Sequence, residues 1–172
     1  DIAAALSAAP GVTVLALVES ARGVKAVEEI AAAPGVVRLV FGTLDYALDL
    51  DLELDDASDG LSYAAGRLAV ASRCAGIATP VGGVTPLLGD EARLLTDLAW
   101  SRRHGFGAKL CIHPRQVAIV HGAFAPSDDE VAWAKRVVAA AEASGGGAVA
   151  VDGTMVDRPV LLRAHALLAR TR

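Results

Sequence analysis

Two acidic side chains follow short apolar runs, at positions where they could bind a cation. Glu19 comes directly after the run TVLALV, and Asp45 follows the run VVRLVF after the link GTL. If both runs are parallel strands, both acids stand at carboxyl ends, where barrels and doubly wound sheets bind ligands. Converging carboxylates repel each other unless a cation lies between them, and Mg²⁺ needs only one or two protein carboxylates. The sequence therefore raises the hypothesis that Glu19 and Asp45 hold Mg²⁺ or Mn²⁺.

Purely structural roles explain the same two acids. Glu19 could pair with Arg22, which follows it closely in the chain, and Asp45 could cap the next helical turn. The spacing alone does not decide between a metal site and these local roles, so both alternatives stand at this point.

Other polar groups at the ends of predicted elements allow similar alternatives. His113 ends the apolar run before Pro114 and could be a ligand, an acid–base group or a satisfied core histidine. Asp152 and Asp157 lie in the polar segment VDGTMVDRP, where acids are usually solvated. The acid-rich run DLDLELDD at 49–56 lacks the glycine and ligand spacing of an EF-hand, so we interpret it as a solvated loop or helix edge.

The elements that position these residues alternate between strand and helix. Short runs that are apolar on both sides predict parallel strands covered on both faces, at 12–18, 36–41, 77–81 and 108–112. Helical patterns lie between them, at 23–33, 61–75 and 90–104. The order βαβαβαβ predicts an α/β fold with a parallel sheet and right-handed crossovers.

The sequence after the fourth run has a different pattern. Residues 128–144 predict a helix with Ser127 as its N-cap. An Asp-Gly pair in the following segment predicts a short hairpin or an extended arm, and 160–170 predicts a closing helix. We therefore expect two regions, a βα region at 1–125 and a helical and hairpin extension at 126–172.

Composition excludes several classes of protein. The net charge is −4 and no run of Lys and Arg is present, so we expect no nucleic-acid partner. No apolar stretch reaches the roughly 18 to 20 residues of a membrane span, and residues 1–10 do not resemble a signal peptide, so we expect a cytoplasmic protein without a membrane partner. The motifs of P-loops, GxGxxG dinucleotide sites, GxSxG hydrolases and HExxH metalloproteases are all missing.

The first ten residues, DIAAALSAAP, have the pattern of the second half of a helix. Four parallel strands with helices can form a small open sheet, but they also equal half of an eight-stranded barrel, whose usual length is about 250 residues. We therefore expect further residues upstream of this sequence.

Five segments in order resemble one family of enzymes. They are VESARGV at 18–24, VFGTLDYALDL at 40–50, GFGAKLCIHPRQV at 105–117, AFAPSDDEVAWAKRVVAAAE at 123–142 and GGAVAVDGTMVDRPV at 146–160. Together they resemble the citrate lyase beta subunit-like proteins of the HpcH/HpaI aldolase group, which includes malyl-CoA and citramalyl-CoA lyases. The resemblance runs from about residue 15 to the C-terminus.

The resemblance implies a (β/α)₈ TIM barrel, of which this sequence would hold strands five to eight plus a C-terminal extension. It implies a Mg²⁺-dependent carbon–carbon lyase acting on a coenzyme A thioester and a 2-oxo acid, with Glu19 and Asp45 as the metal ligands. It also implies a homo-oligomer, commonly a trimer, in which Asp157 of the GxMxD segment reaches a neighbouring subunit and transfers a proton.

Substrate contacts are expected at two further places. Backbone N–H groups of Gly42, Thr43 and Leu44 would bind the substrate carboxylate. His113, which matches the family's motif for strand eight, would lie near the coenzyme A or the substrate.

The sequence departs from the family pattern at two points. Gly82 stands in PVGGVT where family members often carry an acid. The resemblance also implies that the arginine that binds the substrate carboxylate comes from an N-terminal half, which this sequence does not include. Two other functions are rivals to the coenzyme A lyase. One is an HpcH-type aldolase that cleaves free hydroxy-oxo acids, although the long tail favours the coenzyme A enzymes. The other is a non-catalytic barrel or assembly subunit, for which Gly82 is the only indication.

Overall fold

The computed structural model describes residues 11–54, 59–144 and 149–171. They belong to two units, Asp1–Phe124 and Ala125–Arg172, which are described separately below. The helix end expected at 1–10 and two acids of the acid-rich run, Asp55 and Asp56, lie outside the described residues. Within the described ranges, no helix has both the length and the apolar character that crossing a membrane requires.

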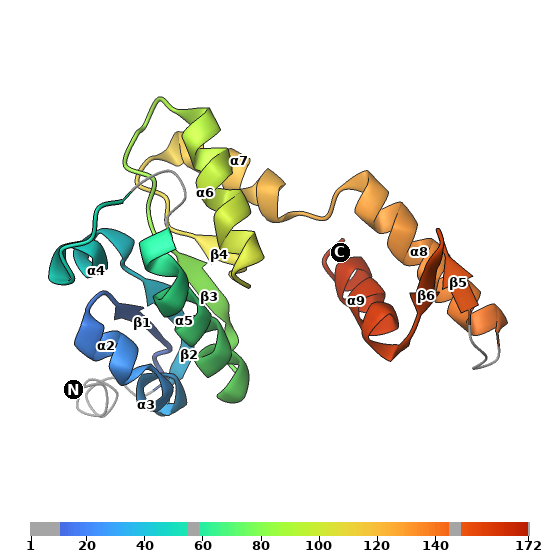
Figure 1. Cartoon of the computed structure of the whole chain (residues 1–172), viewed down its shortest axis with the longest axis horizontal. Helices are drawn as coiled ribbons and strands as arrows, with labels where there is room; N and C mark the ends of the chain where they lie inside the picture. Colours follow the sequence, from blue (N-terminus) through green and yellow to red (C-terminus); the bar gives the residue numbers. More distant parts are fainter. Residues whose placement is uncertain (1–10, 55–58, 145–148, 172) are drawn as a thin grey trace. The chain divides into compact units, whose positions relative to one another are not determined.

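A parallel sheet of four strands forms the centre of the first unit (Figure 1). The strands are β1 (Val14–Val18), β2 (Val36–Phe41), β3 (Ala78–Gly82) and β4 (Ala108–Lys109), paired in chain order. The predicted α/β class and parallel sheet are confirmed. Because all four strands run the same way, the residues after them meet at one edge of the sheet.

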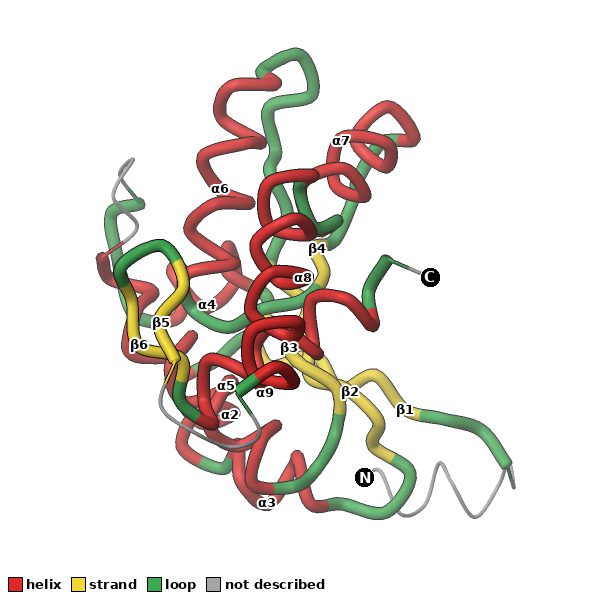
Figure 2. The backbone as a smooth tube through the Cα atoms, turned by 90° about the vertical axis from the view of Figure 1, so that its right-hand side faces the viewer, coloured by secondary structure: helices red, strands yellow, loops and turns green. Residues whose placement is uncertain are grey.

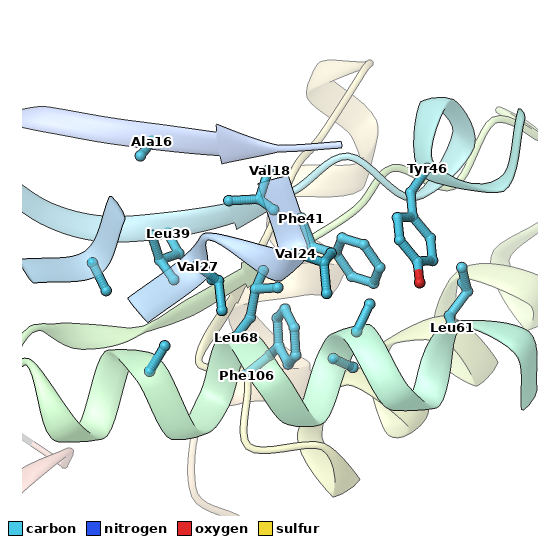
Figure 3. Close-up of a cluster of buried hydrophobic side chains, with 14 of the residues drawn as sticks. Ala16, Val18, Val24, Val27, Leu39, Phe41, Tyr46, Leu61, Leu68 and Phe106 are labelled. Atoms are coloured by element: carbon cyan, nitrogen blue, oxygen red, sulfur yellow. The ribbon is translucent and has the colours of Figure 1, made fainter. Parts of the chain in front are cut away.

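Helices cover one face of this sheet and enclose an apolar core. They include α2 (Ala21–Lys25), α3 (Val27–Ala32), the short 3₁₀ helix η1 (Asp59–Leu61) and α5 (Ser62–Cys74). Figure 3 shows Leu39 and Phe41 of β2 packed with Leu68 of α5 and with Phe106. The prediction of one helix at 23–33 is wrong, because the helical bonding is interrupted at Ala26, the C-cap of α2.

The sequence prediction missed two helices that follow the apolar runs at 36–41 and 108–112. Helix α4 (Thr43–Asp49) begins just after β2, and α7 (Pro114–Phe124) begins with a proline, which suits the first turn of a helix. Helix α6 (Glu91–Arg103) agrees with its prediction and packs on α7. The strand expected at 108–112 is shorter, since the Ile112 N–H donates to the Gln116 side chain instead of to the sheet.

The other face of β1 is open. Ala16 and Val18 are buried against the helices, whereas Leu15 and Leu17 between them are 60% and 53% exposed. The expectation that this strand is covered on both faces is therefore wrong for the residues described. Because side chains alternate along a strand, the next residue on the open face is Glu19.

The second unit pairs two helices with a hairpin. Helix α8 (Asp128–Ala143) has the predicted N-cap Ser127 within a full capping box, and it packs on α9 (Arg158–Ala169). Strands β5 (Val149–Val151) and β6 (Thr154–Val156) are antiparallel, as Figure 2 shows. Asp152 and Gly153 join them with φ of 52° and 77°, so the predicted Asp-Gly hairpin is confirmed.

Two positions of α5 test the core. Leu68→Ala should lower the free energy of unfolding by about 2–5 kcal/mol, because the fully buried side chain leaves a cavity. Val70→Ala on the same helix, where the side chain is 60% exposed, should change it by less than about 0.5 kcal/mol. Urea unfolding of both variants measures the difference, and equal values would contradict this description of the core.

Candidate metal and substrate site

Glu19 lies in a turn that is fixed on both sides. It follows β1 on the open face of the sheet, and Ser20 caps α2 by accepting a hydrogen bond from the Gly23 N–H at 3.1 Å. The next N–H, of Ala21, donates to Asp49 Oδ2 of α4 at 2.7 Å. The backbone around Glu19 is therefore tied both to its own helix and to α4.

Gly42 brings the end of β2 against Glu19. Its N–H donates to the Val18 carbonyl at 2.9 Å, which continues the ladder between β1 and β2. A β-carbon built on Gly42 would lie 2.5 Å from Glu19 Cβ and 2.9 Å from Glu19 Oε2. Only glycine fits at this position while Glu19 keeps its place.

Asp45 lies in the first turn of α4, just beyond Gly42. Asp45 and Asp49 are one helical turn apart and therefore share a face of α4. Since Asp49 reaches Ala21, the side of α4 that bears Asp45 is turned toward the loop that carries Glu19. Two separate strand ends thus bring the two predicted acids to the same edge of the sheet.

The two local roles considered for these acids are not seen. In the described part of the chain, Glu19 and Arg22 form no ion pair, and the N-cap of α4 is Gly42, so Asp45 does not cap the helix. Glu19 and Asp45 are both exposed carboxylates. The acid-rich run was expected to be a solvated loop or helix edge, and its described acids Asp49, Asp51 and Glu53 are exposed. Asp49, the last residue of α4, also accepts the hydrogen bond from the Ala21 N–H.

This donor set fits a hard divalent ion that keeps several waters. Within the described residues, no three His, Cys, Asp or Glu side chains gather around one point. Glu19 and Asp45 therefore supply two carboxylates, and the other coordination positions fall to water or substrate oxygens, as is usual for Mg²⁺.

A cavity of about 390 Å³ lies beside the start of α4. Thr43 and Leu44 line it, and most of its remaining wall is apolar, including Leu61, Val84 and Trp100. Two of the three residues predicted to contact substrate therefore border an accessible space, and the third, Gly42, lies directly before them.

The other predicted site residues have local partners. His113 is half-buried, and its Nδ1 accepts a hydrogen bond from the Arg115 N–H at 3.2 Å at the start of α7. In the second unit, Asp157 is the N-cap of α9, and its Oδ1 accepts from the Val160 N–H at 3.0 Å. An acid–base role for either residue stays a prediction.

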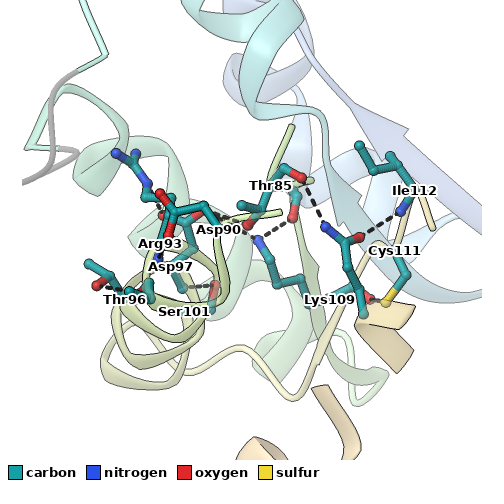
Figure 4. A network of polar contacts seen from close by, with 12 residues as sticks. Thr85, Asp90, Arg93, Thr96, Asp97, Ser101, Lys109, Cys111 and Ile112 are labelled. Atoms are coloured by element: carbon teal, nitrogen blue, oxygen red, sulfur yellow. Dashed lines mark hydrogen bonds and ion pairs between the residues drawn. The ribbon is translucent and has the colours of Figure 1, made fainter. Parts of the chain in front are cut away.

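A buried polar network next to the site was missed from the sequence (Figure 4). Lys109 of β4 donates to the Gly83 carbonyl at 2.7 Å and lies 4.0 Å from Asp97 of α6. Asp97 also accepts from Thr85 Oγ1 at 2.5 Å and from Arg93 Nε at 2.8 Å. Burial lowers the pKa of Lys109, and the Asp97 carboxylate opposes that effect. A lysine inside the apolar run AKLCI was the available signal, because a buried charge needs partners.

Comparison with known proteins identifies relatives of this chain. Residues 6–114 match the model of the HpcH/HpaI aldolase/citrate lyase family. A citrate lyase subunit beta-like protein of Deinococcus radiodurans is 36% identical over 91% of this chain and 56% of its own length. A (3S)-malyl-CoA thioesterase of Cereibacter sphaeroides is 33% identical over 99% of this chain and 60% of its own length. The chain thus spans little more than half the length of the curated relatives it matches.

Solved structures show the same relationship. The protein CitE of Mycobacterium tuberculosis, in complex with magnesium, acetoacetate and coenzyme A, superposes with a TM-score of 0.84 at 33% identity, over 96% of this chain and 62% of that one. A citrate lyase of Burkholderia xenovorans superposes with a TM-score of 0.82 at 27% identity, over 98% and 55%.

The close approach at Gly42 can be tested directly. Gly42→Ala should weaken Mn²⁺ binding about tenfold or more, because the new methyl group must displace Glu19. Gly66→Ala is the matched control, since a β-carbon there meets nothing within 4 Å and alanine favours the helix. Electron paramagnetic resonance of free Mn²⁺ measures both affinities. Unchanged Mn²⁺ binding in Gly42→Ala would contradict the site described here.

Proposed function

Since this chain belongs to the HpcH/HpaI aldolase/citrate lyase family, we propose that it carries the metal site of a Mg²⁺-dependent carbon–carbon lyase. The observation that carries the proposal is the pair of exposed carboxylates, Glu19 and Asp45, at neighbouring strand ends held together by Gly42. The proposed substrates are 3-hydroxyacyl-CoA thioesters such as citryl-, malyl- or citramalyl-CoA. They are cleaved to an acyl-CoA and a 2-oxo acid or similar carbonyl product.

The proposed architecture is a (β/α)₈ barrel in which the sheet of this chain supplies strands five to eight. Two observations support it. The strands are parallel and adjacent in chain order, and the open face of β1 carries the apolar side chains Leu15 and Leu17, which would line the barrel interior. Glu19 then stands at the C-terminal mouth of the barrel, where TIM-barrel active sites lie.

Each residue of the site has a proposed task. Glu19 and Asp45 would hold the ion, which as a Lewis acid would stabilise the negative charge that develops on the oxo-acid portion. The N–H groups of Gly42, Thr43 and Leu44 would orient the carboxylate of that portion. His113 would lie on the coenzyme A or substrate side, with its Nδ1 engaged by Arg115.

Asp157 would act on the other fragment. When the carbon–carbon bond breaks, the acyl thioester leaves as an enolate, and Asp157 would protonate it. In the condensing direction, Asp157 would instead remove a proton from the acyl thioester to form the enolate. We propose that it does so from a neighbouring subunit of a homotrimer. Its bond to the Val160 N–H supports this task, because the cap fixes the carboxylate in one orientation.

Thioester hydrolysis is a second candidate function. The relative named (3S)-malyl-CoA thioesterase is similar over 99% of this chain, so water attack on the thioester belongs in the same assay. Cleavage releases acyl-CoA, whereas hydrolysis releases free coenzyme A, and a thiol reagent distinguishes the two.

In the full-length natural protein, Asp45→Asn should lower Mg²⁺-dependent cleavage of citryl-, malyl- or citramalyl-CoA by about a hundredfold or more. The reason is that Lewis-acid stabilisation of the transition state contributes several kcal/mol. The fold should persist, because Asp45 is exposed. Turnover of each thioester is followed with and without Mg²⁺. Asp45→Asn with normal turnover would refute the metal assignment, and cleavage of free hydroxy-oxo acids alone would favour the aldolase.

Asp157→Asn should lower turnover about a hundredfold or more while leaving stability nearly unchanged, since asparagine caps a helix as well as aspartate does. Asp152→Asn, in the turn of the hairpin that precedes Asp157, is the control and should keep turnover. If Asp157 acts in the site of a neighbouring subunit, co-expression of the Asp157→Asn and Asp45→Asn chains should restore activity at about a quarter of the sites. Those are the sites in which one chain supplies an intact Asp45 and its neighbour supplies an intact Asp157. No restoration would place Asp157 in the site of its own chain or outside catalysis.

A further inference from the structure

The turn at the end of β3, residues 82–85, is held by side chains from three other elements (Figure 4). Lys109 Nζ of β4 donates to the Gly83 carbonyl at 2.7 Å. Thr85, which is fully buried, donates its hydroxyl to Asp97 of α6 at 2.5 Å. We call this segment the β3 turn.

A third contact completes the anchoring of the β3 turn. Gln116 of α7 is 3% exposed, and its Nε2 donates to the Thr85 carbonyl at 3.1 Å. The Gly83 and Thr85 carbonyls and the Thr85 hydroxyl are thus bound by side chains of β4, α6 and α7, which together set the position of the backbone of the turn.

Lys109 is the most costly of these partners. Its side chain is 3% exposed, and a buried ammonium is strongly destabilising unless it is paired and hydrogen-bonded. An apolar side chain of similar length would fill the same volume without that cost. What the ammonium adds is a directed bond to one carbonyl of the β3 turn, with Asp97 nearby as the opposite charge.

The β3 turn in turn sets the position of α4. A β-carbon on Gly83 would lie 2.2 Å from Thr43 Oγ1 and 2.9 Å from Thr43 Cβ, so the backbone of the turn is packed directly against Thr43. Thr43 is the first residue of α4, and Asp45 lies in the same helical turn. A shift of Gly83 therefore changes the space available to the residues that place Asp45.

We propose that Lys109 is a positioning residue for the metal site. By holding the Gly83 carbonyl it keeps the β3 turn against Thr43, and so keeps Asp45 where it can share a divalent cation with Glu19. This inference rests on the proposed function only for the identity of that cation site. It assigns Lys109 no contact with substrate or ion.

The test compares Lys109→Met with Arg38→Met in the full-length natural protein. Arg38 of β2 also donates to a carbonyl of β3, that of Thr79, but near the start of the strand, away from the site. Each variant loses one bond from a side chain to a carbonyl and one contact with another side chain, which is Thr79 Oγ1 for Arg38 and Asp97 for Lys109. Lys109→Met should weaken Mn²⁺ binding about tenfold or more and raise the Mg²⁺ concentration for half-maximal turnover by the same factor. Arg38→Met should lower only the melting temperature.

The readouts separate positioning from general stability. A lower melting temperature in Lys109→Met with normal Mn²⁺ affinity would overturn the proposal, and so would equal losses of affinity in both variants. Thr85→Val, which removes the bond to Asp97 at nearly constant volume, replaces Lys109→Met if that variant does not fold, and normal Mn²⁺ binding there would overturn the proposal as well.

Mn²⁺ affinity tests the positioning role, and thioester cleavage tests the proposed function. A weaker Mn²⁺ affinity in Lys109→Met would support the positioning role even if no thioester is cleaved. If the unsubstituted protein binds no Mn²⁺, the metal site of the proposed function and the positioning role both fail.

Discussion

The candidate site depends on two glycines whose backbone lies so close to a neighbouring side chain that no other residue fits in their place. Gly42 passes Glu19, and Gly83 passes Thr43, at distances that would put an added methyl group within 2.5 and 2.2 Å of its neighbour. Because residues 42 and 43 are consecutive, the end of β2 is held between its two neighbouring strand ends. The three strand ends therefore behave as one packed unit, in which a displacement at any point reaches the carboxylates. Tight packing of this kind transmits small shifts because the interior offers no empty space to absorb them.

The alternation of side chains along the strands separates the charges of this unit into two groups. Glu19 follows Leu15 and Leu17 on the open face, where in the described residues it has no cationic partner. Lys109 and Asp97 lie behind the sheet, in a buried network with hydrogen-bond partners. Buried charges that are paired in this way are structural by their energetics, because removing one partner leaves the other uncompensated. Exposed carboxylates at a shared edge are available for a ligand, and a divalent cation would relieve their repulsion.

Sequence patterns predicted the elements whose signals are local and strong. The four parallel strands, α6, the capping box of α8 and the Asp-Gly hairpin all rest on apolar runs, caps and turn residues. Helices α4 and α7 were missed because each begins just after an apolar run that had been predicted as a strand, within a motif interpreted as the end of that strand. The position of Glu19 and Asp45 at one edge of the sheet was predicted because both acids follow apolar runs, and their role as metal ligands stays a prediction. Asp49 and Lys109 were missed because their partners, Ala21 and Asp97, lie on other elements, and such pairs appear only in the folded chain.

Gly82 is the sequence feature that favoured the hypothesis of a non-catalytic relative, and the side chains around Gly82 weaken that hypothesis. A β-carbon there would lie 2.8 Å from the hydroxyl of Ser101, which donates to the Asp97 carbonyl at 2.8 Å. An acid at this position would therefore require Ser101 to move. The carboxylate beside the β3 turn comes instead from α6, where Asp97 binds Thr85 and lies near Lys109. Loss of an acid from the strand has thus not removed negative charge from the turn, so Gly82 by itself is no argument that the site has lost its chemistry.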